Sequence, residues 1–177
     1  MFNLIISIIA IALVVVLAGA SLYYGGDAFN RGSSDAKAAT LINQAQQIQA
    51  AATLFTASEG GAPTTLADLE GAYLSSTPSL PVGADGATWE LGEAKNALAK
   101  TVSIVSVELP FAAKTEDGIT MDICKTVNKN GAGVVFCSVA ATGTFDDTNL
   151  VAGSGAADAD VEAVDVTVSK AKIHMTI

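Results

Sequence analysis

Basic side chains are scarce in this sequence. Nine Lys and Arg residues stand against eighteen Asp and Glu residues, which gives the 177-residue chain a formal net charge of −9. Phosphate contacts need clustered Lys and Arg, and because no such cluster occurs, no direct nucleic-acid-binding groove is expected. Charged residues make up 15% of the chain, whereas hydrophobic residues make up 50%. This balance excludes a disordered chain and indicates that a large apolar surface is hidden from water.

Histidine is scarcer still, and its scarcity limits the chemistry available. His174 is the only histidine, and neither cysteine nor a second base lies near it in the sequence to complete a metal site or a catalytic triad. The glycine-rich piece at 83–86 lacks the ending of a phosphate-binding loop. Acidic stretches at 146–149 and 158–165 offer oxygens for calcium, but their spacing is not that of an EF-hand loop, and solvated surface loops are favoured. We therefore expect no enzyme, no cofactor and no metal.

The sequence contains two cysteines, Cys124 and Cys137. Their separation suits a disulfide-closed loop, which would stabilise the fold by about 3 kcal/mol in the chain-entropy model. Two unrelated buried thiols are the alternative. Because disulfides persist in oxidising compartments, the pair favours an exported domain.

Charge is absent from the whole stretch between Phe2 and Tyr24. A helix rising about 1.5 Å per residue would carry this run across the roughly 30 Å hydrocarbon layer of a membrane. A cleaved secretory signal is the alternative, because residues 18–20 resemble a cleavage site, but no basic residue precedes the run. We assign 1–26 to a transmembrane or filament-core helix. Its surface is expected to consist of the side chains of Phe2, Leu4, Ile5, Ile8, Ile9, Ile11, Leu13, Val14, Val15, Val16 and Leu17.

A hinge and a second helix are predicted after the apolar run. Glycine disfavours a helix interior by about 1 kcal/mol, so Gly19, Gly25 and Gly26 mark a candidate hinge. An amphipathic helix is then expected over 34–57, with Ser33 or Ser34 as its N-cap. Its apolar residues alternate at four- and three-residue spacing and form one stripe for packing on the globular head. The stripe consists of Leu41, Ala45, Ile48, Ala52 and Phe55.

Residues 27–177 are expected to form one globular α+β domain that includes this amphipathic helix. Strands are predicted at 87–91, 101–109, 133–139 and 164–177, which are enough for one antiparallel sheet. The alternation changes phase near Ser169, which predicts a bulge or a tight turn there. Short helices are predicted at 64–74, opened by a capping arrangement, and at 117–128, with Asp117 as the N-cap. Trp89 and Phe111 are expected in the core.

These parts, in this order, resemble a type IV pilin, in particular one of type IVb. The resemblance is carried by the apolar start, its amphipathic continuation, the segment at 63–74 and the late pair of cysteines. It implies a long helix packed on an antiparallel sheet with a C-terminal disulfide. It further implies a structural subunit of an extracellular filament that supports adhesion, motility, DNA uptake or conjugation. The expected partners are copies of the same chain, the inner membrane before assembly and the pilus assembly machinery.

The family usually carries a glutamate at the fifth mature position, where this sequence has Ile5. The first acidic residue is Asp27, so assembly would rest on the apolar run itself, with Asn3 and Ser7 as the only polar side chains in its first turns. Two other interpretations stay open. One is a single-span, membrane-anchored minor pilin or a pseudopilin of a secretion system. The other is a secreted binding module with a cleaved signal.

Overall fold

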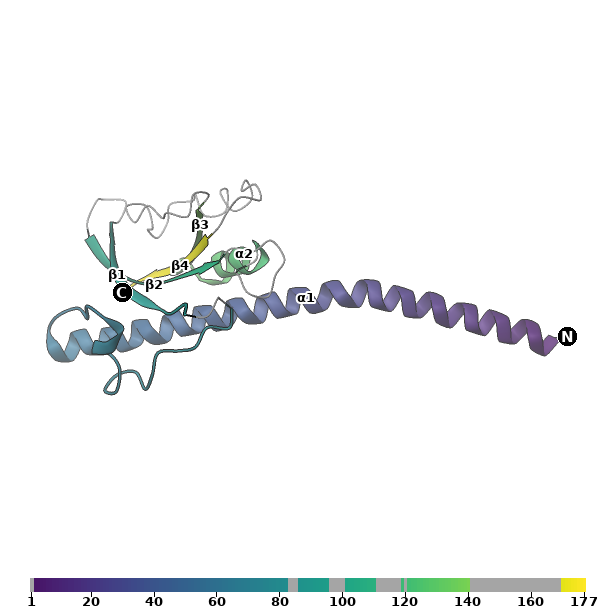
Figure 1. Cartoon of the computed structure of the whole chain (residues 1–177), viewed down its shortest axis with the longest axis horizontal. Coiled ribbons are helices and arrows are strands. Elements are labelled where there is room, and N and C mark those ends of the chain that lie inside the picture. Colours follow the sequence, from purple (N-terminus) through teal and green to yellow (C-terminus); the bar gives the residue numbers. More distant parts are fainter. Residues whose placement is uncertain (1, 83–85, 96–100, 111–118, 120, 141–169) are drawn as a thin grey trace. The chain divides into compact units, whose positions relative to one another are not determined.

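The computed structural model describes residues 2–82, 86–95, 101–110, 119, 121–140 and 170–177. The chain divides into two compact units, Met1–Ser34 and Asp35–Ile177. The elements in chain order are α1 (Phe2–Glu59), a 3₁₀ helix η1 (Leu66–Asp68), β1 (Glu90–Lys95), β2 (Thr101–Pro110), α2 (Met121–Asn130), β3 (Val135–Ala140) and β4 (Lys170–Thr176) (Figure 1). In the second unit the long helix packs on a four-stranded antiparallel sheet, which confirms the predicted α+β class.

Helix α1 is continuous from Phe2 to Glu59, so the predicted start of a second helix at Ser33 or Ser34 is wrong. Ser33 and Ser34 lie inside the helix and do not cap a new one. The physical reason is that no proline occurs before Pro63, so nothing removes a donor from the backbone hydrogen-bond ladder. The helix ends at Glu59, where Gly60 adopts a φ of +76° and donates its N–H to the carbonyl of Thr56 at 3.0 Å. This left-handed residue after the last turn is a common way for a helix to end.

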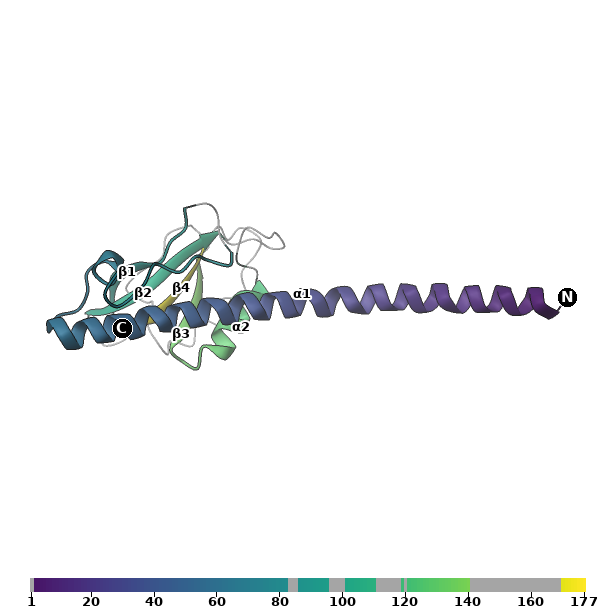
Figure 2. The same cartoon turned by 90° about the horizontal axis from the view of Figure 1, so that it is seen from below.

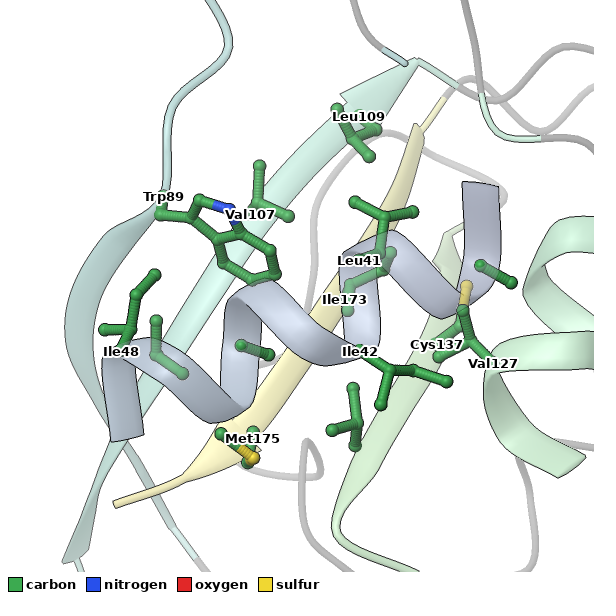
Figure 3. Packing of buried hydrophobic residues seen from close by; sticks show 14 of the residues in the cluster. Leu41, Ile42, Ile48, Trp89, Val107, Leu109, Val127, Cys137, Ile173 and Met175 are labelled. Carbon is green, nitrogen blue, oxygen red and sulfur yellow. The ribbon is translucent and has the colours of Figure 1, made fainter. Parts of the chain in front are cut away.

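Residues 35–59 of α1 lie across one face of the sheet (Figure 1, Figure 2). Leu41, Ala45, Ile48 and Ala52 are fully buried there, and Phe55 packs half-buried against the same core. The close-up in Figure 3 shows Leu41 and Ile48 among side chains of the sheet. The apolar face of the helix and the inward face of the sheet therefore form one core. Its large members from outside α1 include Trp89, Val107, Leu109, Ile173 and Met175 (Figure 3).

The strands follow the order β1-β2-β4-β3, so β1 and β3 form the edges of the sheet. Strand β4 pairs with β2 and β3, and Ile173 lies between Val107 and Cys137. The first strand is displaced from its predicted place, since it begins at Glu90 and is defined by its pairing with β2. The third begins at Val135 because Ala132 and Gly133, with φ of 52° and 72°, form a turn. The predicted phase change near Ser169 and residues 164–169 lie outside the described residues.

The segment after α1 is held on the helix by side chains. Gln44, which lies beside the predicted stripe, accepts a hydrogen bond from Nε1 of Trp89 at 3.2 Å and donates one to the carbonyl of Ser79 at 2.7 Å. Phe55 meets the ring of Tyr73 edge-on, with centroids 5.6 Å apart. These contacts attach the described parts of the segment between α1 and β1 to the long helix at Tyr73, Ser79 and Trp89.

The predicted helix at 64–74 shrinks to the single turn η1. The predicted capping arrangement is present, because the Asp68 carboxylate accepts the backbone N–H groups of Thr64 at 3.0 Å and Thr65 at 2.8 Å. These hydrogen bonds lower the pKa of Asp68 below its usual value. The turn does not continue because Gly71 adopts a φ of +89° and donates its N–H to the carbonyl of Leu74 at 2.7 Å.

Helix α2 begins later than predicted, at Met121. Ile119, which was expected inside the helix, instead donates its N–H to the carbonyl of Pro110 at 2.8 Å and so extends the pairing at the end of β2. Asp117, the predicted N-cap, and Phe111, a predicted core residue, lie outside the described residues. After α2, a Cβ added at Gly131 would lie 2.1 Å from the carbonyl oxygen of Val135, so only glycine fits this turn.

Candidate membrane or assembly surface

The first unit presents an apolar helix surface that nothing in the described chain covers. All fourteen of its described Leu, Ile, Val, Tyr and Phe side chains are between 54% and 80% exposed. The predicted filament-core residues other than Phe2 lie within this range, at 54% to 68%. The side chain of Phe2 is outside the described part. Since exposed apolar patches of this extent mark interaction sites or membrane contact, we regard this surface as the candidate functional site.

The hydroxyls of Ser7 and Ser21 are hydrogen-bonded within the helix. The hydroxyl of Ser7 donates to the carbonyl of Asn3 at 2.8 Å, and that of Ser21 donates to the carbonyl of Leu17 at 2.8 Å. In a helix the backbone N–H and C=O groups form hydrogen bonds with one another, and a segment must satisfy its backbone in this way before it can enter the hydrocarbon layer of a membrane. The hydroxyls therefore present no unpaired donor to hydrocarbon, although their residue type is polar.

Among the described residues, α1 is the one helix long and apolar enough to cross a membrane, as judged by length and composition. The uncharged residues 2–26 would span about 37 Å at 1.5 Å per residue, against a hydrocarbon layer of about 30 Å. Charge returns at Asp27 and Arg31, one turn apart. The segment thus has the length and the polar boundary that a membrane span requires.

The predicted hinge glycines are helical in this structure. Gly19, Gly25 and Gly26 each have no atom within 4 Å of the place where a Cβ would lie. No packing within the described chain therefore requires glycine at these positions. The hinge stays a prediction.

The two cysteines form the predicted disulfide, with their Cα atoms 5.4 Å apart. The bond joins α2 to β3, and Asn128 strengthens the same junction, because its amide donates to the carbonyl of Cys137 at 3.1 Å and accepts its N–H at 2.7 Å. Asn128 thereby pairs backbone groups of β3, which is an edge strand among the strands that the structure describes. Sequence reasoning missed this role. The available signal was an amide side chain one helical turn after Cys124.

His174 lies on the face of the sheet opposite to α1 and is 3% exposed. It pairs across the strands with Ser106 and Phe136, and its ring stacks on that of Phe136 with centroids 5.8 Å apart. Burial lowers the pKa of His174 from 6.5 to about 4, the Lys172 charge acts in the same direction, and a hydrogen bond to the Lys172 backbone opposes them. Among the residues that the structure describes, none forms a hydrogen bond with its Nδ1. His174 is therefore neutral at pH 7 and buried.

In the described part of the chain, no three His, Cys, Asp or Glu residues lie together in a way that could hold a metal ion. The acidic stretches at 146–149 and 158–165 lie outside the described residues. Comparison of the chain with protein-family models, with curated protein sequences and with solved structures gave no significant match.

Proposed function

We propose that this protein is a structural, non-enzymatic subunit of an extracellular filament like a type IV pilus, stored in the inner membrane and polymerised through the apolar part of α1. One observation carries the proposal: a helix that is apolar on all sides is exposed along residues 4–17 and belongs to the same chain as a disulfide-containing α+β unit. Copies of the chain, the membrane and an assembly machinery are the proposed partners. No cofactor is part of the proposal.

The energetics favour assembly once the subunit leaves lipid. Burying apolar surface contributes roughly 25 cal/mol per Å², so enclosing this helix among its copies supplies tens of kcal/mol before the cost of ordering is subtracted. A head-to-tail contact that does not close on itself then yields a fibre. Ile5 and the other early residues provide no carboxylate, so the drive is apolar contact and not ion pairing.

The test is removal of detergent from the purified full-length chain without lipid, followed by electron microscopy. Fibres of uniform width are expected. A monodisperse, water-soluble protein would contradict the proposal, because it would show that the apolar surface needs no cover.

A single-span, membrane-anchored protein is the second candidate. The same exposed surface supports it, because lipid alone could enclose side chains that carry no charge to direct subunit pairing. In the same experiment this candidate predicts insertion into added vesicles and amorphous precipitate, not fibres, when lipid is left out.

A further inference from the structure

The outward face of α1 in the second unit lacks charge. No residue between Lys37 and Glu59 is charged. The buried side of this stretch has no use for charge, but the exposed side of a helix on a globular unit is normally where charged residues gather. Here the exposed side is built from Ala, Ser, Thr, Asn, Gln and Leu, in a chain whose net charge is −9.

The exposed residues of this face also have a regular spacing. Seven of them recur at alternating intervals of four and three, as do the contact positions of helices that pack nearly parallel to one another. We name this set the outer seam. It consists of Ala36, Thr40, Asn43, Gln47, Ala50, Leu54 and Ala57, all of which are exposed.

Two further observations distinguish the outer seam from an ordinary wet helix face. Leu54 is 58% exposed, and in the described part of the second unit Val134 is the only other exposed large hydrophobic residue. The glutamines facing inward are engaged, since Gln44 bonds Ser79 and Gln49 donates to the carbonyl of Thr176 at 2.9 Å. The amides of Asn43 and Gln47 have no such bond in the described chain, so their hydrogen-bonding capacity remains available.

The net charge of the chain indicates which molecule packs on the outer seam. Two copies of a chain with a net charge of −9 repel one another wherever acidic surfaces meet. A neutral face with small side chains is where identical copies can approach closely without like-charge pairs. The outer seam also follows, along the same continuous helix, the apolar residues that the proposed filament would bury.

We propose that the outer seam packs against α1 of a second copy of this chain. The inference rests on the proposed function, because storage in one membrane orients all copies the same way and so favours parallel helices. It adds the specific face of the second unit that completes the contact.

The first test uses full-length variants and measures the fraction of protein that pellets as filaments. Ala50→Glu should lower this fraction at least tenfold, because a charge would be enclosed in the contact. Ala50→Ser, which keeps a small neutral side chain, should stay within twofold of the wild type. Thr53→Glu places the same charge on an exposed position about 60° round the helix from Ala50, and should also stay within twofold. Fluorescence of Trp89, the single tryptophan, checks that each variant keeps its core.

A second test does not depend on filaments. Leu54→Cys and Thr53→Cys are reconstituted into vesicles at low and high protein density and labelled with a charged maleimide, to which the disulfide-bonded native cysteines do not react. Crowding should slow labelling of Leu54→Cys at least fivefold and leave Thr53→Cys within twofold, since neighbouring residues point about 100° apart on a helix.

The outcomes separate the two proposals. If the wild type forms filaments but Ala50→Glu does so equally well, or Thr53→Glu is equally defective, the outer seam is overturned and the proposed function stands. If the wild type forms no filaments, the proposed function fails. The labelling experiment then decides alone, and equal rates at residues 53 and 54 overturn the outer seam.

Discussion

The two parts of helix α1 treat the same residue type in opposite ways. Ile9 in the first unit is 55% exposed, whereas Ile48 in the second is fully buried against the sheet. Local conformation does not distinguish them, since both lie in one continuous helix. What differs is the arrangement of neighbours: the first part is apolar all round and has nothing packed on it in the described chain, whereas the second confines its apolar residues to one stripe. An apolar side chain is therefore unfavourable in water in both parts of the helix. The distribution of apolar residues around the helix decides whether the sheet of the same chain can bury them or whether lipid or another molecule must do so.

The largest effect expected concerns the first part alone. The double variant Val14→Asp/Leu17→Asp should oppose membrane insertion by about 6 kcal/mol, since an acidic residue near the centre of a span costs about 3 kcal/mol. Flotation with vesicles should drop to background, while Trp89 fluorescence stays that of the native core. A double variant that still floats would show that this part of the helix is not what holds the protein in lipid.

The comparison is sharpest with matched substitutions of isoleucine. Ile48→Ala should lower the free energy of unfolding by about 2–5 kcal/mol, because it removes buried methyl groups and leaves a cavity. Ile9→Ala, an identical change in the same helix, should alter it by no more than about 0.5 kcal/mol, because its side chain is 55% exposed and nothing in the described part of the chain packs on it. Denaturant titration in detergent, followed by Trp89 fluorescence, measures both. Equal losses of stability would show that Ile9 and Ile48 are packed to the same extent, which contradicts their difference in exposure.

Acid should weaken the second unit through His174. The depressed pKa means that, between pH 6.5 and about 4, the unfolded chain binds a proton that the folded chain does not. Stability should therefore fall as the pH falls through this window, by about 3 kcal/mol, and level off below it with respect to this group. His174→Gln should remove this part of the pH dependence while leaving the contribution of the carboxylates. An unchanged pH profile in that variant would mean that another group is responsible.

Reduction of the disulfide should act only on the second unit. Opening the Cys124–Cys137 bond should cost about 3 kcal/mol for a loop of this length. Hydrogen exchange should rise first in α2 and β3, the two elements that the bond joins, while exchange in residues 2–34 is unchanged in detergent. Cys124→Ala/Cys137→Ala provides the matched control without reductant. An equal rise of hydrogen exchange in both units would contradict the prediction that reduction affects only the second unit.

The sequence by itself determined the features that depend on short-range pattern. The apolar run, the apolar stripe from Leu41 to Phe55 and the α+β class follow from periodicity and from the scarcity of charge, and the spacing of the two cysteines favoured the observed disulfide. Boundaries were less secure. Ser33 and Ser34 have the chemistry of an N-cap, but a cap forms only where the preceding chain is not helical, and here it is.

Only the tertiary structure decided the rest, because the deciding contacts join residues far apart in the chain. Pairing with β2 fixed where β1 begins, the carbonyl of Pro110 held Ile119 out of α2, and stacking on Phe136 accompanied the burial of His174. The amide of Gln44 became an anchor because Trp89 lies opposite, whereas that of Gln47 remained outward. The sequence specifies which side chains are apolar and therefore favour burial. The tertiary fold, or contact with another molecule, determines which surface buries them.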